Sequence, residues 1–304
     1  MIHRTHQLRA CTHLVNHSLR LKGGSELTFS DLEFESNRKD ALAMERLSSS
    51  PYVIDIFGFC GQSAINELAT GIDLEAHSQK LRGKTSDDAL RQKLTISIML
   101  ARGVAHIHGV DGSDNATMAH YDLKPENVLV FDGDTPKFSD FNFVEFLRWD
   151  RTKQERCGFE SVDHMPWYRA PEELIMRRTS AEKKGWALSS LGLVEKKEDQ
   201  PLLNEKVDVW SLGHLIYEIL TGNRATRRPE NLAMRRIPLA RAIARVREDV
   251  LQGKIPWDSG DLNGTHLAAK AMGRAIKRCF TMDPHKRWSA HDIAEEMSVA
   301  LERI

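Results

Sequence analysis

The chain has 304 residues, of which 41% are hydrophobic, so it can bury a sizeable core as one large domain or two lobes. Its 43 basic residues balance 43 acidic residues, which leaves no global field to attract nucleic acid or an anionic membrane. No uninterrupted apolar stretch approaches the roughly 20 residues that span a bilayer, and the first residues lack the apolar core of a secretory signal. We therefore expect an intracellular, cytoplasmic protein with no nucleic-acid partner and no membrane segment in this chain.

The predicted elements change character along the chain. Residues 1–35 are polar and weakly patterned. The spacing of apolar residues then predicts a helix at 38–47 and buried helices at 88–108 and 207–220. Runs of β-branched and apolar residues predict strands at 52–60 and 64–69. Gly222 follows the last of these helices and is expected to end it in the left-handed conformation. The pattern thus predicts a small strand-rich part over 1–69 and a larger helical part over 70–304.

The four cysteines are scattered and form no CxxC pair; they are Cys11, Cys60, Cys157 and Cys279. This spacing favours free thiols in a reduced compartment over disulfides or a zinc site.

Residues 177–204 form a charged, serine-rich stretch of mixed periodicity. We interpret it as an inserted surface loop, solvated and partly disordered. The alternative is a docking segment for a partner.

The strongest chemical signal lies near the middle of the chain, where residues 120–127 read HYDLKPEN and residues 140–142 read DFN. Asp122 offers a carboxylate that can take a proton from a hydroxyl. Asn127 and Asp140 offer oxygen atoms that can hold metal ions on the phosphates of ATP. The alternation of apolar residues between the two strings predicts a short hairpin around an Asp-Gly-Asp turn.

These strings resemble the catalytic loop and the metal-binding turn of eukaryotic protein kinases of the serine/threonine type. Further markers recur in family order between about residue 40 and residue 290. Residues 167–173 (WYRAPEE) look like the end of an activation segment, in which Glu172 would pair with Arg287, and Asp208 would hold the backbone of the catalytic loop. The resemblance implies an α+β, bilobal kinase fold, with an incomplete N-lobe at 1–69 and a C-lobe at 70–304.

The resemblance also implies the site residues. Asp122 would be the catalytic base, and Lys124 would neutralise charge on the transferred phosphate. Asn127 and Asp140 would bind magnesium and, through it, ATP. The adenine would bond to the backbone of a short segment that comprises Glu67, Leu68 and Ala69. His120 is expected to serve packing and backbone bonding.

Two residues depart from the family pattern in the core of the site. Tyr121 stands where most regulated kinases have an arginine that receives a phosphate on the activation segment, and tyrosine offers no cation. A phosphate switch on Thr152 or Ser161 that acts through residue 121 is therefore not expected. Asn142 replaces the usual glycine, and asparagine tolerates positive φ, so we expect the turn to persist with Asp140 aimed at metal.

The N-terminal part departs further, because no GxGxxG precedes the helix. Lys22 is the candidate for the nucleotide-binding lysine and Asp40 for its carboxylate partner. A different register would put His17 at the lysine position, and Glu45 lies at a different angle on the helix. Either the chain lacks its first two strands or the N-lobe has diverged, and a truncated N-lobe is the simpler explanation.

The sequence thus predicts a serine/threonine kinase that uses ATP and magnesium and acts on protein substrates. A pseudokinase scaffold, or a truncated fragment with little activity, is the first alternative. A small-molecule phosphotransferase of similar architecture is the second, and the APE-like segment with Arg287 argues against it.

Overall fold

A computed structural model describes residues 19–20, 26–27, 31–60, 63–112, 115–162, 164–183, 191–224, 238–254, 262 and 264–304. The helices are α1 (Asp31–Arg46), α2 (Leu74–Leu81), α3 (Asp87–His108), α4 (Arg178–Lys183), α5 (Lys206–Thr221), α7 (Leu239–Leu251), α8 (Leu267–Cys279) and α9 (Ala290–Leu301). The strands are β1 (Leu19–Arg20), β2 (Glu26–Leu27), β3 (Ile56–Cys60), β4 (Ser63–Asn66), β5 (Ile72–Asp73), β6 (Met118–Ala119), β7 (Val128–Phe131), β8 (Thr135–Phe138), β9 (Glu145–Phe146), β10 (Trp149–Asp150), β11 (Glu155–Arg156), β12 (Met176–Arg177) and β13 (Leu193–Val194). Short 3-10 helices include η3 (Pro125–Asn127), η4 (Pro166–Tyr168), η5 (Pro171–Leu174) and η6 (Lys197–Asp199).

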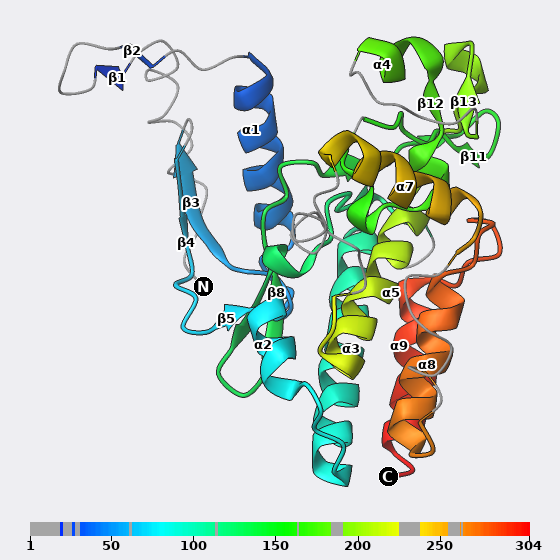
Figure 1. Cartoon of the computed structure of the whole chain (residues 1–304). Helices are drawn as coiled ribbons and strands as arrows, with labels where there is room; N and C mark the ends of the chain where they lie inside the picture. The colour runs from blue at the N-terminus through cyan, green and yellow to red at the C-terminus, as the bar shows by residue number, and fades with distance from the viewer. Residues whose placement is uncertain are drawn as a thin grey trace.

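The helical part is built around α3 and α5, which pack against each other and against α8 and α9 (Figure 1). The side chain of Ser86 caps α3 by accepting a hydrogen bond from the Ala89 amide at 3.3 Å. Helix α5 is buried along almost its whole length, and it ends at Gly222 with φ 69°. The predicted positions of both helices, and the left-handed glycine that ends the second, are confirmed.

The predicted hairpin is also confirmed. Strands β7 and β8 are antiparallel, with Val128 opposite Phe138, and β5 pairs with the other edge of β7. The turn between them has positive φ at Gly133 and Asp134. Strand β6 ends just before residue 120 and β7 begins just after residue 127, so these two short strands hold both ends of the catalytic loop. Strand β8 ends at Phe138, two residues before the DFN turn.

The strand-rich part consists of α1 beside the β3–β4 hairpin (Figure 1). The predicted strand at 52–60 is shorter than expected because its first residues bond elsewhere. Tyr52 accepts a hydrogen bond from the Phe138 amide at 2.8 Å, and Ile54 donates to the Phe138 carbonyl oxygen at 3.0 Å. This exchange joins the strand-rich part to the β7–β8 hairpin. The helical bundle and the smaller strand-bearing part together form the predicted bilobal α+β fold.

The stretch at 177–204 contains more regular structure than the predicted loop. Within its described residues it forms α4, β13 and η6, and β13 pairs in parallel with β12. Leu203 and Phe159 exchange backbone hydrogen bonds of 3.0 and 2.8 Å. Nζ of Lys197 lies 2.7 Å from Oε1 of Glu160 in an ion pair. Residues 191–204 are mostly exposed or half-buried, and this segment is also bonded to the chain that precedes the APE-like motif. Residues 184–190 lie outside the described residues.

Among the described residues, no helix is both long and apolar enough to cross a bilayer. Cys60, Cys157 and Cys279 form no disulfide with one another, and Cys11 lies outside the described residues.

Candidate active site

A buried aspartate holds the backbone of the catalytic loop, as the sequence predicted. Asp208 accepts hydrogen bonds from the amides of His120 and Tyr121, at 2.7 and 2.8 Å, and its Oδ2 lies 2.9 Å from Nε2 of His108. Burial raises the pKa of Asp208, but these partners outweigh burial and lower it below its ordinary value. The loop is therefore anchored by a charged group from α5.

His120 has the packing role expected for it. Its ring lies 4.5 Å from the ring of Phe141, and its Nε2 lies 3.1 Å from the Ser139 carbonyl oxygen. The side chain is fully buried. It therefore joins the catalytic loop to the DFN turn and does not face an open site.

The carboxylate of Asp122 is surrounded by donors. Its Oδ1 accepts from Nη2 of Arg169 at 2.6 Å, and its Oδ2 accepts from Nζ of Lys124 and from Nδ2 of Asn127, the latter at 3.2 Å. Burial raises the pKa of this carboxyl, but the Arg169 guanidinium and the Lys124 ammonium outweigh it and keep the pKa below its ordinary value. Asp122 is therefore an ionised acceptor at neutral pH.

The structure also connects the two residues predicted to bind metal. Ser139, which precedes Asp140, donates its amide and its hydroxyl to the carbonyl oxygen of Asn127, at 2.9 and 3.2 Å. The side-chain nitrogen Nδ2 of Asn127 donates to the carbonyl oxygen and to Oδ2 of Asp122. The side-chain oxygen of Asn127 is left for a ligand. Asp140 has φ 61°. One carboxylate and one amide oxygen suit magnesium, which takes few protein ligands together with phosphates and waters.

The turn at Asp140 differs from the expected one. Asn142 was expected to adopt positive φ, but the left-handed residue of this turn is Asp140 itself. Asn142 instead donates from Nδ2 to Oδ1 of Asp140 at 2.6 Å. The asparagine therefore holds the Asp140 carboxylate through its side chain, where a glycine would act through backbone freedom; the aim of Asp140 at metal stays a prediction.

Helix α1 contacts this turn through Asp40, the carboxylate predicted to pair with the nucleotide-binding lysine. Its Oδ1 accepts from the Phe141 amide at 2.6 Å, and Ser36 donates to the Asn142 carbonyl oxygen at 2.8 Å. Burial, aided by the charge of Asp140, raises the pKa of Asp40. Glu45, the alternative carboxylate, is exposed. Lys22 and His17 lie outside the described residues, so the pairing of Asp40 with Lys22 stays a prediction.

The segment predicted to bind adenine follows β4. Glu67 donates its amide to the Asp55 carbonyl oxygen at 2.8 Å, and its carboxylate pairs with Lys137 at 2.7 Å. The backbone amide of Ala69 has no hydrogen-bond partner among the described residues. The adenine contact at this segment stays a prediction.

The predicted ion pair at the APE-like motif is confirmed. Arg287 donates from Nη1 and Nη2 to both oxygens of Glu172, at 2.7 and 3.1 Å, and both side chains are buried. The pair ties η5 to the segment that leads into α9.

Tyr121 bonds to the activation segment without a cation. Its hydroxyl accepts from the Val162 amide at 3.0 Å and lies 3.4 Å from the Ser161 hydroxyl, and its ring packs against that of Phe159 at 4.8 Å.

The sequence did not predict the contact of Arg169 with Asp122. The spacing of four residues between Arg169 and Glu173 could have indicated the pair of those two residues, but no spacing in the sequence points from Arg169 to Asp122.

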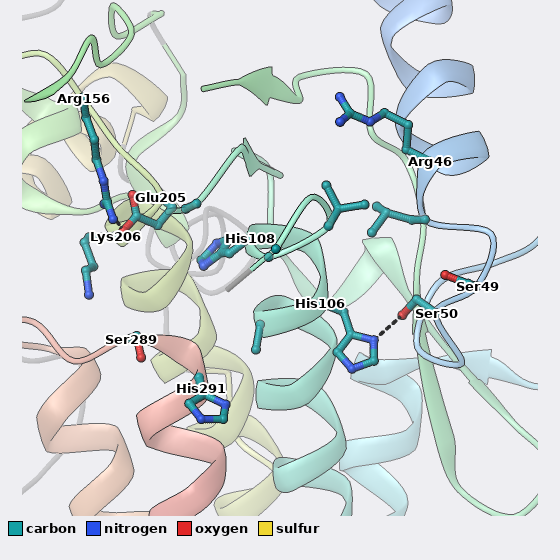
Figure 2. A pocket seen from close by; sticks show the side chains of 16 residues that line it. Arg46, Ser49, Ser50, His106, His108, Arg156, Glu205, Lys206, Ser289 and His291 are labelled. Atoms are coloured by element: carbon teal, nitrogen blue, oxygen red, sulfur yellow. Dashed lines mark hydrogen bonds and ion pairs between the residues drawn. The ribbon is translucent and has the colours of Figure 1, made fainter. Parts of the chain in front are cut away.

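A cavity of about 640 Å³ is lined by residues of α1, α3, α5 and α9, and it contains none of the predicted site residues. Figure 2 shows Arg46 on one side of it and Arg156 with Glu205 and Lys206 on the other. Arg46 is already paired with Asp111, and Arg156 with Glu205. Arg46, Arg156 and Glu205 are thus paired, and Nζ of Lys206 donates to the Arg287 carbonyl oxygen at 3.0 Å.

Comparisons with known proteins agree with this geometry. The family model of the protein kinase domain matches residues 30–297. The chain is 26% identical to the liver/testis isoform of the phosphorylase b kinase gamma catalytic chain of Bos taurus, over 84% of this chain and 52% of that protein. It is 26% identical to the serine/threonine-protein kinase TOUSLED of Arabidopsis thaliana, over 56% of this chain and 20% of that protein. It is 27% identical to the probable serine/threonine-protein kinase PBL20 of the same plant, over 62% of this chain and 40% of that protein. The chain thus spans about half the length of the phosphorylase kinase relative, and less of the others.

Proposed function

The chain belongs to the protein kinase family, and we propose that it transfers the γ-phosphoryl group of ATP to serine or threonine hydroxyls of a protein. The observation that carries the proposal is the hydrogen bonding of Asp122. A carboxylate oxygen has two acceptor positions. Lys124 and Asn127 take both positions on Oδ2, whereas Arg169 takes one on Oδ1. One acceptor position on Oδ1 therefore remains for a substrate hydroxyl.

In this proposal Asp122 accepts the proton of the substrate hydroxyl while the hydroxyl oxygen bonds to the γ-phosphorus. The bond between the γ-phosphorus and the bridging oxygen of the β-phosphate breaks, and ADP leaves with that oxygen. Lys124 contributes a fixed positive charge beside the transferred group. Asn127 and Asp140 would hold magnesium, which neutralises charge on the phosphates when bound with ATP. The Glu67 carbonyl and the Ala69 amide would bind the adenine edge.

The remaining parts of the proposal concern nucleotide, partners and location. Lys22 would bind the phosphates and pair with Asp40, and the segment at 177–204 would offer a docking surface beside the activation segment. The substrate would be a cytoplasmic protein and not a nucleic acid. The confirmed pair of Glu172 and Arg287 supports a protein substrate over a small molecule, because it stabilises the segment on which kinases seat polypeptides.

The test is transfer of radiolabelled phosphate from ATP with magnesium to a generic protein such as casein. Because positioned bases contribute about 10² to 10⁴ in rate, Asp122→Asn should remove most of the transfer, while ATP with magnesium should still raise the thermal unfolding midpoint of the variant. Equal transfer by both proteins would refute the role of Asp122. Absence of transfer and of ATP binding in the wild type would favour the pseudokinase, an alternative that the missing GxGxxG keeps open.

A further inference from the structure

Arg169 links the end of the activation segment to the catalytic loop. Its Nη2 donates to Oδ1 of Asp122 at 2.6 Å, and its Nη1 donates to the Tyr121 carbonyl oxygen and to Oε2 of Glu173, the latter at 3.2 Å. The guanidinium carbon lies 5.3 Å from the centre of the Tyr121 ring. The side chain is only 9% exposed, so these contacts are largely shielded from water.

These contacts determine which way Asp122 faces. Without Arg169, Oδ1 would have no donor among the described residues, and the carboxylate would be held through Oδ2 alone by Lys124 and Asn127. A guanidinium is planar and presents its donors in a fixed arrangement, so it restrains the carboxylate more strongly than a flexible ammonium does. With Arg169 on one side of Oδ1, the remaining acceptor position points in a single direction.

The link runs opposite to the one that the family pattern suggests. In most regulated kinases the cation lies on the catalytic loop, at the position of Tyr121, and the anion is a phosphate on the activation segment. Here the cation lies on the activation segment and the anion is the catalytic carboxylate. We propose, on the basis of the proposed function, that Arg169 is a positioning residue that fixes the Asp122 carboxylate from the activation segment and so couples that segment to catalysis without a phosphate.

A purely structural role is the competing explanation, because Arg169 also neutralises the buried Glu173. The two explanations differ in what Glu173 contributes. Its Oε1 already accepts from the Ala170 amide at 2.7 Å, and it does not contact Asp122. Glu173→Gln removes the charge that Arg169 would neutralise and leaves the bond between Arg169 and Asp122 in place. This variant therefore separates the two roles.

Steady-state kinetics on the whole chain test the proposal. Arg169→Met should lower kcat by about 100-fold, the low end for a misplaced base, with little change in the KM for ATP. Arg169→Lys should recover part of that loss, and Glu173→Gln should be nearly as active as the wild type. Arg148→Met is the matched control, because Arg148 is an exposed arginine of the same segment. Equal losses of kcat in Arg169→Met and Glu173→Gln would overturn the proposal.

A double-mutant cycle on unfolding gives a readout that does not need activity. Residues that contact each other show non-additive effects on stability. Arg169→Met should therefore lower the thermal midpoint by a different amount in the Asp122→Asn background than in the wild type. Additive shifts would show that Arg169 does not hold Asp122. A wild type without phosphoryl transfer would instead refute the proposed function, and the cycle would still decide whether Arg169 holds this carboxylate.

Discussion

Asp140 is the residue on which the proposed metal site depends most, because it supplies the only carboxylate of the pair. Asp140→Ala should abolish the thermal stabilisation that ATP with magnesium gives the wild type, since a ligand stabilises a protein only as far as it binds the folded state. The measurement is the unfolding midpoint with ATP, with and without magnesium. Asp132→Ala, in the β7–β8 turn, is the control and should respond to ATP like the wild type. Equal stabilisation of the Asp140 variant would place the metal elsewhere.

Tyr121 is a second residue whose effect can be isolated, because its hydroxyl contributes one hydrogen bond to the stability of the fold. Tyr121→Phe deletes the acceptor for the Val162 amide and keeps the buried ring. A net hydrogen bond contributes about 1 kcal/mol, so the free energy of unfolding should fall by about that amount. Urea denaturation measures it. Tyr52→Phe is the matched control, because the Tyr52 hydroxyl has no partner among the described residues, and its loss should be near zero. Equal losses would show that the hydrogen bond contributes nothing specific.

The ease of predicting each residue follows from how local its contacts are. Asp122, Lys124 and Asn127 lie within six consecutive positions of one loop and contact one another, so the string itself carried the signal. Arg169 reaches Asp122 across 47 positions of sequence, and no spacing rule connects the two. Asn142 was expected to act through its backbone and acts through its side chain, because only the fold shows which φ each turn residue adopts.

At the scale of elements, the buried pair of Glu172 and Arg287 ties η5 to the entrance of α9. Removing one partner of a buried pair leaves an uncompensated charge, at a cost of about 3–5 kcal/mol. Glu172→Gln should therefore lower the free energy of unfolding by about 3 kcal/mol, the low end of that range. This loss, measured with urea, should come with little change in the KM for ATP.

The matched control for this pair is Glu195→Gln. Glu195 bonds Arg178 at the same 2.7 Å, but both side chains are exposed. Exposed pairs contribute about 0–1 kcal/mol. If both variants lose the same stability, burial does not strengthen the pair at Glu172.

The elements themselves were predictable to different degrees. The long buried helices α3 and α5 have continuous apolar patterns and a polar cap or terminal glycine, and their ends were placed closely. The strand at 52–60 was overextended, because Tyr52 and Ile54 bond to Phe138 and a run of apolar residues does not reveal its partner. The bonds of Leu203 and Lys197 were missed for the same reason, since their partners Phe159 and Glu160 lie well before them in the chain.

At the scale of the whole molecule, two buried groups give the stability opposite dependences on pH. Burial raises the pKa of Glu173 to about 7 from its ordinary 4.5, although Arg169 opposes the rise. Between these values the folded state holds the proton more tightly than the unfolded state does. The contribution of Glu173 therefore favours folding below pH 4.5 and is lost as the pH rises through about 7.

His214 acts in the other direction. Burial lowers its pKa to about 3 from 6.5, because its ring lies in the core between Tyr168 and Phe280. Here the unfolded state takes up the proton first. The contribution of His214 is therefore present above pH 6.5 and is lost as the pH falls toward 3.

The last prediction is that single substitutions remove these two dependences separately. Glu173→Gln should abolish the loss of stability between pH 5 and 7, so its free energy of unfolding should gain on the wild type as the pH rises over that interval. His214→Phe should lessen the loss below pH 6.5, whatever its effect at neutral pH. Urea unfolding at a series of pH values from 4 to 8 measures both slopes. A Glu173 variant with the slope of the wild type would mean that this carboxylate stays ionised in the folded protein, held so by Arg169.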